Sequence, residues 1–451
     1  MKKLWQKNWE LDKVIETFET KDDIVLDQNL IIYDIYGSIA HAKMLNKIGI
    51  LSLDELHNLM SGLLKIKELY NNKSFNLQAG DEDIHTKIET YLTTEYGDIG
   101  KKIHTGRSRN DQVLTAIRLY TREMLFDIWE SVLILTESMQ SFAVKYEFVP
   151  MPGYTHTQKA MPSSVGMWAG ALVEGLLDDL VTLKASYKLI NTSPLGSGAG
   201  YGVPLELDRE YVAKLLGFSK VQINSLYCQN SRGKFEGAVL ASLNTILFDI
   251  NKLATDIVLF TSSEFGLFKV ADTLTSGSSI MPQKRNVDIA ELLRSKIHIV
   301  LGNYVQMVSL SSNLISGYNR DLQDSKKSLM ESLQITLDSL RVSKILIMNT
   351  EPQKKQLSKA MTPEIFATRH ALELVKNGVP FREAYQTVAS QPSVSVIPTE
   401  ESYLRESTHL GGTGNLCLSL YKDTLKEEKE IYKNEKNMVM NNLTRLLSYE
   451  E

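Results

Sequence analysis

Cysteine is scarce in this sequence, which limits how its fold can be held together. Only Cys228 and Cys417 occur among the 451 residues, so a framework of disulfide bonds is not expected. A chain of this length with so few cysteines is typical of a reducing compartment. We therefore expect a cytoplasmic protein whose core is held by apolar packing.

Long apolar runs are also missing. The N-terminal stretch MKKLWQKNWELDK has no apolar run after its lysines, so a signal peptide is not expected. The most apolar stretches, such as Ile128 to Leu135, contain charge and are shorter than the ~20 residues that span a bilayer. The sequence therefore predicts neither export nor insertion into a membrane.

No cluster of basic residues stands out. Lys and Arg total 50 against 54 Asp and Glu, which gives a net charge of -4. A nucleic-acid surface needs positive charge gathered on one face, so nucleic acid is not an expected partner. A small charged substrate is compatible with this balance, because its site needs only a few placed charges.

Helical periodicity is abundant, and no alternating strand pattern of any length is found. A chain of 451 residues suggests two or three domains. From Leu30 to Ile48 apolar residues recur at three- and four-residue steps, and Gly49 provides a stop. Ser52 and Glu55 form a capping box that predicts the start of the next helix.

The middle of the chain predicts four long helices. They are Gln112 to Val144, Pro162 to Ile190, Phe235 to Phe260 and Val287 to Leu310. Apolar residues lie on several faces of the third, so we expect burial on several sides, in a bundle and against other subunits. After Met361 we expect shorter helices in a separate small domain.

Two segments contain side chains suited to catalysis. Residues 104–112 read HTGRSRNDQ before a long helix, and Arg, Ser and Asn donors at a helix N-terminus suit a bound carboxylate. A solvated helix cap is an equally good interpretation of that segment alone. Residues 151–158 read MPGYTHTQ, with one His suited to proton transfer. A hydrogen-bonded loop histidine is its plainer alternative.

Two further segments have the composition of active-site loops. Residues 277–286 read GSSIMPQKRN, which predicts a flexible loop able to close. A mobile surface linker would leave Ile280 and Met281 exposed without reason. Residues 318–326 read YNRDLQDSK, where a solvated charged segment would look much the same.

Two other patterns resemble cofactor sites only weakly. Gly196 to Gly200 is glycine-rich but follows no expected strand, which argues against a dinucleotide site. The acidic run 81–83 with His85 has no second cluster at metal-ligand spacing, so an acidic helix start is favoured. No metal and no organic cofactor is expected.

Together these segments resemble the fumarase/aspartase superfamily. GSSIMPQKRN matches every fixed position of its shared motif, Gly-Ser-Ser-x-Met-Pro-x-Lys-x-Asn, and HTGRSRNDQ is similar to the argininosuccinate lyases in particular. The resemblance implies an all-α fold of three domains around a central five-helix bundle, here 1–105, 106–360 and 361–451. It also implies a homotetramer with a core of twenty helices, in which each active site draws on three subunits.

The activity implied is the reversible cleavage of argininosuccinate into arginine and fumarate, in arginine biosynthesis. Ser278 corresponds to the catalytic base, and His156, paired with Glu291, to a group of acid or electrostatic function. Lys284 and Asn286 correspond to groups that stabilise a carbanion. The implied substrate contacts are Asp27, Ser108, Arg109, Asn110, Thr155, Asn286, Tyr318, Gln323 and Lys326.

The sequence departs from this family at a few positions. The usual Trp-Gly-Gly-Arg-Phe is replaced around Gln6-Lys7-Asn8, and a common serine is replaced by Asp23. Both lie near the amino-acid end of the expected site, so they bear on substrate specificity. Two other interpretations stay open, namely another fumarate-releasing lyase of the superfamily and a non-catalytic helical scaffold.

Overall fold

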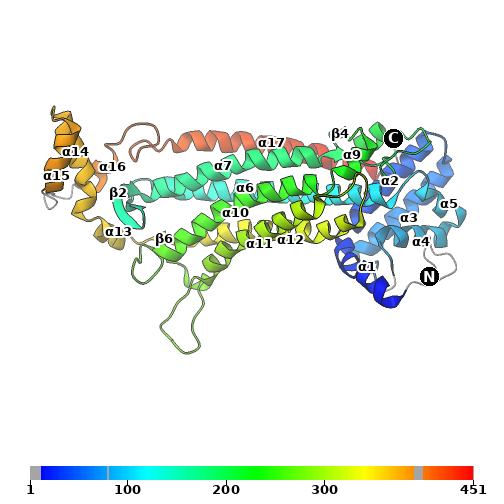
Figure 1. The fold of residues 1–451 in the computed structure, drawn as a ribbon, viewed down its shortest axis with the longest axis horizontal. Helices are drawn as coiled ribbons and strands as arrows, with labels where there is room; N and C mark the ends of the chain where they lie inside the picture. The colour runs from blue at the N-terminus through cyan, green and yellow to red at the C-terminus, as the bar shows by residue number, and fades with distance from the viewer. Residues whose placement is uncertain (1–11, 79–80, 391–399, 450–451) are drawn as a thin grey trace.

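Helices make up most of the structure, a computed structural model that describes residues 12–78, 81–390 and 400–449. The molecule is a long rod, with its longest helices running along the rod axis (Figure 1). The all-α prediction is therefore confirmed. The replaced stretch at Gln6-Lys7-Asn8 lies outside the described residues.

The N-terminal helices gather at one end of the rod (Figure 1). They are α1 (Lys13–Leu26), α2 (Ile31–Lys47), α3 (Leu53–Asn71), α4 (Ile84–Tyr96) and α5 (Asp98–Lys101). The capping box expected at the start of α3 is present, because Ser52 and Glu55 bond to each other's backbone N–H groups. Gly49 ends the preceding helix at a φ of 78°, a conformation that glycine adopts without strain.

Five long helices form the centre of the rod. They are α6 (Arg109–Lys145), α7 (Val165–Ile190), α10 (Lys234–Phe260), α11 (Asp288–Ser311) and α12 (Ser325–Met348). Each packs on at least two of the others, α6 on α7 and α12, and α10 on α7, α11 and α12. Apolar residues on several faces of α10 are buried, as its sequence predicts.

Helix α6 also buries two arginines among the segments that follow α7. Arg118 donates hydrogen bonds to Thr192 and Ser231, and Arg122 donates to the carbonyl oxygens of Leu216 and Gly217. Burial lowers the pKa of each guanidinium to about 10. Each guanidinium donates mostly to neutral oxygen atoms of these segments. The two arginines therefore fix the loops near the N-terminal end of the rod.

Short strands interrupt the helices. They pair as β1 (Pro150–Thr155) with β2 (Gln158–Ser164), β3 (Thr192–Ser193) with β4 (Lys220–Val221), and β5 (Phe268–Val270) with β6 (Thr350–Pro352). The helix expected from Pro162 starts instead at Val165, because Pro162 pairs with Pro152 in the β1–β2 hairpin and Ser164 caps α7.

The remaining helices lie at the two ends of the rod, except for the last. They are α8 (Arg209–Leu215), α9 (Ser225–Asn230), α13 (Lys354–Ala360), α14 (Ala367–Lys376), α15 (Phe381–Ser390), α16 (Glu400–Leu404) and α17 (Leu418–Leu446). The shorter helices expected after Met361 are found in α14 to α16, but the expectation is wrong for α17, which has 29 residues and lies along α6 and α7 (Figure 1). Its buried Leu425, Tyr432 and Val439 recur every seven residues and form the seam. The domain limits 1–105, 106–360 and 361–451 stay a prediction.

None of the helices in the described part of the chain is long and apolar enough to cross a membrane. The described residues also contain no cluster of three metal-ligating side chains. The acidic run before α4 has a structural use instead. Asp83 caps α4 through the Thr86 N–H, and His85 bonds to Asp34 at 2.8 Å.

Candidate active site

The HTGRSRN segment turns directly into α6. The Ser108 hydroxyl accepts the Asn110 N–H and caps the helix, while Asp111 accepts the Ser108 N–H in return. Asp111 also accepts the N–H groups of Gly196 and Gly198, each at 3.0 Å. Burial raises the pKa of Asp111 to about 6, although these three donors act in the opposite direction. The glycine-rich loop therefore anchors α6 through Asp111.

Arg109, expected to bind a carboxylate, already has two carboxylate partners in the chain. Its guanidinium bonds to both oxygens of Glu82, lies 3.3 Å from Asp83 and donates to the Thr86 hydroxyl at 2.7 Å. The segment 82–85 thus neutralises Arg109. Ser108 is likewise occupied as a cap and does not line the pocket described next.

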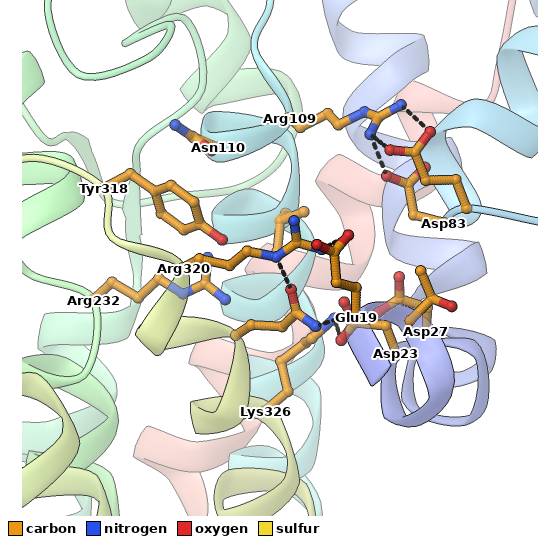
Figure 2. A pocket seen from close by; sticks show the side chains of 14 residues that line it. Glu19, Asp23, Asp27, Asp83, Arg109, Asn110, Arg232, Tyr318, Arg320 and Lys326 are labelled. Atoms are coloured by element: carbon orange, nitrogen blue, oxygen red, sulfur yellow. Dashed lines mark hydrogen bonds and ion pairs between the residues drawn. The ribbon is translucent and has the colours of Figure 1, made fainter. Parts of the chain in front are cut away.

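A pocket opens beside this segment, at the N-terminal end of the rod (Figure 2). Its empty volume, open mouth included, is about 870 Å³. Six of the predicted substrate contacts line it, contributed by η1 (Asp27–Leu30), α6, η4 (Arg320–Asp324), α12 and the loop before η4. These six are Asp27, Arg109, Asn110, Tyr318, Gln323 and Lys326.

The floor of the pocket holds one ammonium group between two carboxylates. Lys326 Nζ lies 2.7 Å from Asp27 Oδ1 and forms a second ion pair with Asp23, and its side chain is only 3% exposed. Burial raises the pKa of Asp23, assisted by the nearby Asp27 carboxylate and opposed by Lys326. One cation thus faces two anions, which leaves the floor with an excess of negative charge.

Gln323 and Tyr318 line two further parts of the pocket, Gln323 next to α1 and Tyr318 away from it (Figure 2). The Gln323 amide donates to the Glu19 carbonyl oxygen at 2.7 Å, and its own oxygen accepts from Arg320 at 3.3 Å. The ring of Tyr318 lies over a further guanidinium, that of Arg232, whose carbon is 5.4 Å from the ring centroid. Arg232 was not among the predicted site residues, because a lone Arg in the stretch QNSRGKF forms no recognisable motif.

His156 lies on the β1–β2 hairpin, at the opposite end of the rod from this pocket (Figure 1). His156 and Thr157 form the two-residue turn with φ values of 52° and 61°. Such a turn favours Asn or Gly, and other residues cost on the order of 1 kcal/mol or more each. Both side chains, and that of Thr155, are exposed. Strain retained in an exposed turn is typical of a functional position.

Ser278 and Lys284 lie on a loop that projects from the side of the bundle, directly before α11. Ser276 and Asn286 close the loop at its base through two backbone hydrogen bonds of 2.9 Å. The Ser278 hydroxyl accepts the N–H groups of Ile280 and Met281 at 3.3 and 3.1 Å. Lys284 is exposed, so the loop keeps a hydroxyl and an ammonium group outside the core.

Within one chain the predicted residues fall into three separate groups. The pocket holds the amino-acid end of the expected site, the hairpin holds Thr155 and His156, and the loop holds Ser278, Lys284 and Asn286. Glu291 is exposed on the first turn of α11, and no hydrogen bond or ion pair joins it to His156. A single chain therefore forms no complete site from these residues.

The fold and a family comparison first define the class of protein. A family model described as lyase matches residues 8–302. An EDDS lyase crystal structure in complex with formate superposes with a TM-score of 0.83 at 21% identity, covering 98% of this chain and 96% of that one. A class II fumarase from Schistosoma mansoni gives a TM-score of 0.70 at 17% identity, covering 86% and 95%. The chain is a lyase with the all-α fold shared by these enzymes.

Curated relatives identify the family more closely. An argininosuccinate lyase from Thermotoga neapolitana is 46% identical over 389 residues, which cover 86% of this chain and 98% of the relative. One from Sorangium cellulosum is 41% identical over 416 residues, covering 92% and 96%. The chain belongs to the argininosuccinate lyase family.

Proposed function

We propose that this lyase cleaves argininosuccinate reversibly into arginine and fumarate, in arginine biosynthesis. The observation that supports this substrate is the pocket at the N-terminal end of the rod. It is lined by both carboxylates and cations, which suits the ammonium and carboxylate groups of an amino acid. A pocket for fumarate alone would not require acidic residues such as Asp23 and Asp27.

The chemical obstacle is a doubly charged intermediate. A proton leaves the carbon next to a carboxylate, the bond from the neighbouring carbon to the guanidino nitrogen breaks, and that nitrogen leaves with the electron pair and takes up a proton. Removing the first proton adds charge to an anionic carboxylate. A positioned base supplies about 10²–10⁴-fold, whereas enzymes lower barriers by about 8–23 kcal/mol. Electrostatic stabilisation therefore has to supply the larger share.

We assign the proton transfer to the loop before α11. Ser278 is the base, and Lys284 holds the developing charge and lowers the pKa of the serine hydroxyl. Asn286 adds a neutral donor, and each well-aimed donor is worth about 3 kcal/mol. Because both ends of the loop are bonded to each other at Ser276 and Asn286, it can close over a substrate as one unit. This elimination needs neither a redox cofactor nor a metal.

We assign the protonation of the leaving nitrogen, or its electrostatic support, to His156 with Glu291. Thr155 and Ser108 would contact the substrate. Arg109 would also contact it, with its guanidinium then shared between the substrate and its carboxylate partners Glu82 and Asp83. His156 suits proton transfer because an ordinary histidine titrates near neutral pH. Because the turn is exposed, the His156 side chain is accessible to the active site of a neighbouring subunit.

The functional unit we propose is a cytoplasmic homotetramer with shared active sites and a core of twenty helices. Its support is the apolar surface of the long helices. On α11, Leu292, Leu301 and Val305 are 53%, 46% and 59% exposed in the single chain. Apolar groups repeated along a helix of the bundle core are typical of a face covered by another subunit. Such an assembly would join the pocket, the hairpin and the loop of different chains.

Fumarate release tests the function directly. Purified protein is mixed with argininosuccinate or with adenylosuccinate, and fumarate is followed by its ultraviolet absorbance. We expect fumarate from argininosuccinate only. Release from adenylosuccinate would favour another fumarate-releasing lyase, and a folded tetramer inactive with both would favour a non-catalytic scaffold.

A further inference from the structure

The ionisable groups of the pocket are nearly all paired with each other. Arg109 pairs with Glu82 and Asp83, Arg320 with Glu19, and Lys326 with Asp23 and Asp27. These pairs include all five carboxylates and three of the four cations that line the pocket. The fourth cation is Arg232, so it is the one to consider as a site for an added anion.

The side chain of Arg232 makes no hydrogen bond and no ion pair with any residue that the structure describes. It is only 4% exposed, and its buried Nε has no acceptor. Arg118 and Arg122, which are buried to the same degree, donate from their terminal nitrogens to carbonyl or hydroxyl oxygens. A buried guanidinium without acceptors costs several kcal/mol, so its position indicates an anion that binds there.

The backbone holds Arg232 in a rigid place. It lies between the end of α9 and the start of α10, flanked by Ser231, which accepts from Arg118, and by Gly233. Gly233 has a φ of 82°, and a Cβ there would lie 2.6 Å from Ser311 Cβ, so the two segments are closely packed. The side chain reaches from this junction into the pocket, below Tyr318 (Figure 2).

We propose that Arg232 binds the α-carboxylate of the arginine part of the substrate. This inference rests on the proposed function. The guanidinium of Arg232 would donate two parallel hydrogen bonds to the carboxylate, and Asp23 or Asp27, which share one lysine, would accept hydrogen bonds from the α-ammonium group. Arg232 and Asp23 attract each other across the pocket, so the two halves of an amino-acid zwitterion have partners on facing sides.

The succinyl end of the substrate fits Arg232 less well. That end has two carboxylates and no ammonium group attached to it, and the carboxylates of the pocket would repel it. Ser278, assigned to remove the proton from the succinyl carbon, and His156, assigned to the leaving nitrogen, are also absent from this pocket. Arg232 is thus a specificity-determining residue at the end of the substrate that does not react.

A pair of ligands tests the assignment. Agmatine is arginine without its α-carboxylate, so the ratio of the two dissociation constants measures what the carboxylate contributes. Titration calorimetry on the intact wild-type enzyme should show arginine binding about 10–100-fold more tightly than agmatine, as one charge-assisted contact allows. In Arg232→Met the ratio should fall to about one, and Arg232→Lys should give an intermediate ratio.

Controls separate this role from support of the fold. Arg341→Met removes an exposed cation outside the pocket and should keep the wild-type ratio. In steady-state assays Arg232→Met should raise the KM for argininosuccinate more than it lowers kcat, because the contact is remote from the reacting carbon. A merely structural role for Arg232 would weaken arginine and agmatine equally, which would overturn the proposal. Failure of the proposed function would look different, because the wild-type enzyme would then release no fumarate.

Discussion

The hydroxyl of Ser278 accepts two backbone N–H groups, a surrounding that stabilises negative charge on its oxygen. We predict that Ser278→Ala lowers kcat for argininosuccinate about 10²–10⁴-fold, with a smaller effect on KM, because a positioned base is worth that factor. The measurement is the initial rate of fumarate formation. Ser263→Ala, at an exposed serine outside the loop, is the control, and near-normal turnover of Ser278→Ala would contradict the assignment.

Asp23 makes the stability of the folded protein depend on pH. Burial raises its pKa above the ordinary value near 3.8, so the folded protein binds this proton more tightly than the unfolded chain. Stability contributed by this group is therefore lost as the pH rises from about 3.8 through the raised pKa. We predict that Asp23→Asn is at least as stable as the wild type at pH 7, and that the difference shrinks toward acid pH.

Thermal unfolding of both proteins at a series of pH values measures this difference. Asp22→Asn changes an exposed carboxyl on the same helix and should follow the wild type at every pH. An Asp23→Asn protein that becomes progressively less stable than the wild type as the pH rises would show that the Lys326 pair outweighs burial.

Sequence motifs predicted only some of the residues that line the pocket. Asn110 and Lys326 could be assigned from the family resemblance because they stand in recognisable runs of residues. Arg232 could not, because its significance depends on which other charges lie around it in space. The pairing of Arg109 with Glu82 could not be predicted either, because 26 residues separate the two in the chain and only the tertiary fold brings them together.

Helix α6 depends on its first turn. Asp111 accepts the Ser108 N–H and the N–H groups of Gly196 and Gly198, so one carboxylate caps the helix and holds a loop. We predict that Asp111→Ala destabilises the protein by about 3 kcal/mol, the sum of a lost cap and of buried N–H groups left without acceptors. A scan of thermal unfolding measures it, and Glu95→Ala, an exposed change on α4, should have little effect.

Long helices were predictable as elements because periodicity, caps and stops agree over many residues. The expected limits of α10 and α11 are each within one residue of those observed. The β1–β2 hairpin was missed because Pro150, Pro152 and Pro162 read as breaks, whereas here they lie in a ladder of only two strands. Helix α17 was missed because the sequence before it is rich in turn residues, which suggested a small irregular domain.

The exposed face of α11 predicts how the whole molecule assembles. Val305 is 59% exposed in the single chain, and so is Leu53 on α3. We predict that Val305→Glu breaks the proposed tetramer, because burying an unpaired carboxylate in a subunit interface is costly, and that fumarate release falls with it. Size-exclusion chromatography with light scattering measures the mass. Leu53→Glu should stay tetrameric, and a tetrameric Val305→Glu would exclude this face from the interface.

The proposed sharing of active sites between chains makes a second prediction for the assembly. Ser278→Ala and Asn110→Ala should each be nearly inactive, yet tetramers reassembled from equal amounts of both should regain about a quarter of the wild-type activity. The reason is that a site taking its Asn110 and its Ser278 from different chains has both residues intact in one of four random combinations. Sites built within one chain would regain nothing, and that result would exclude sharing.

His156 lies at one end of the rod and the pocket lined by Asp27 and Lys326 lies at the other, which has a consequence for when the protein becomes active. A newly synthesised chain can fold and hold its charges in order, but under the proposed arrangement it has nothing that works as an enzyme. Activity would begin only when chains meet, so it would rise more steeply than the amount of protein made. Dilution would abolish it without unfolding any chain.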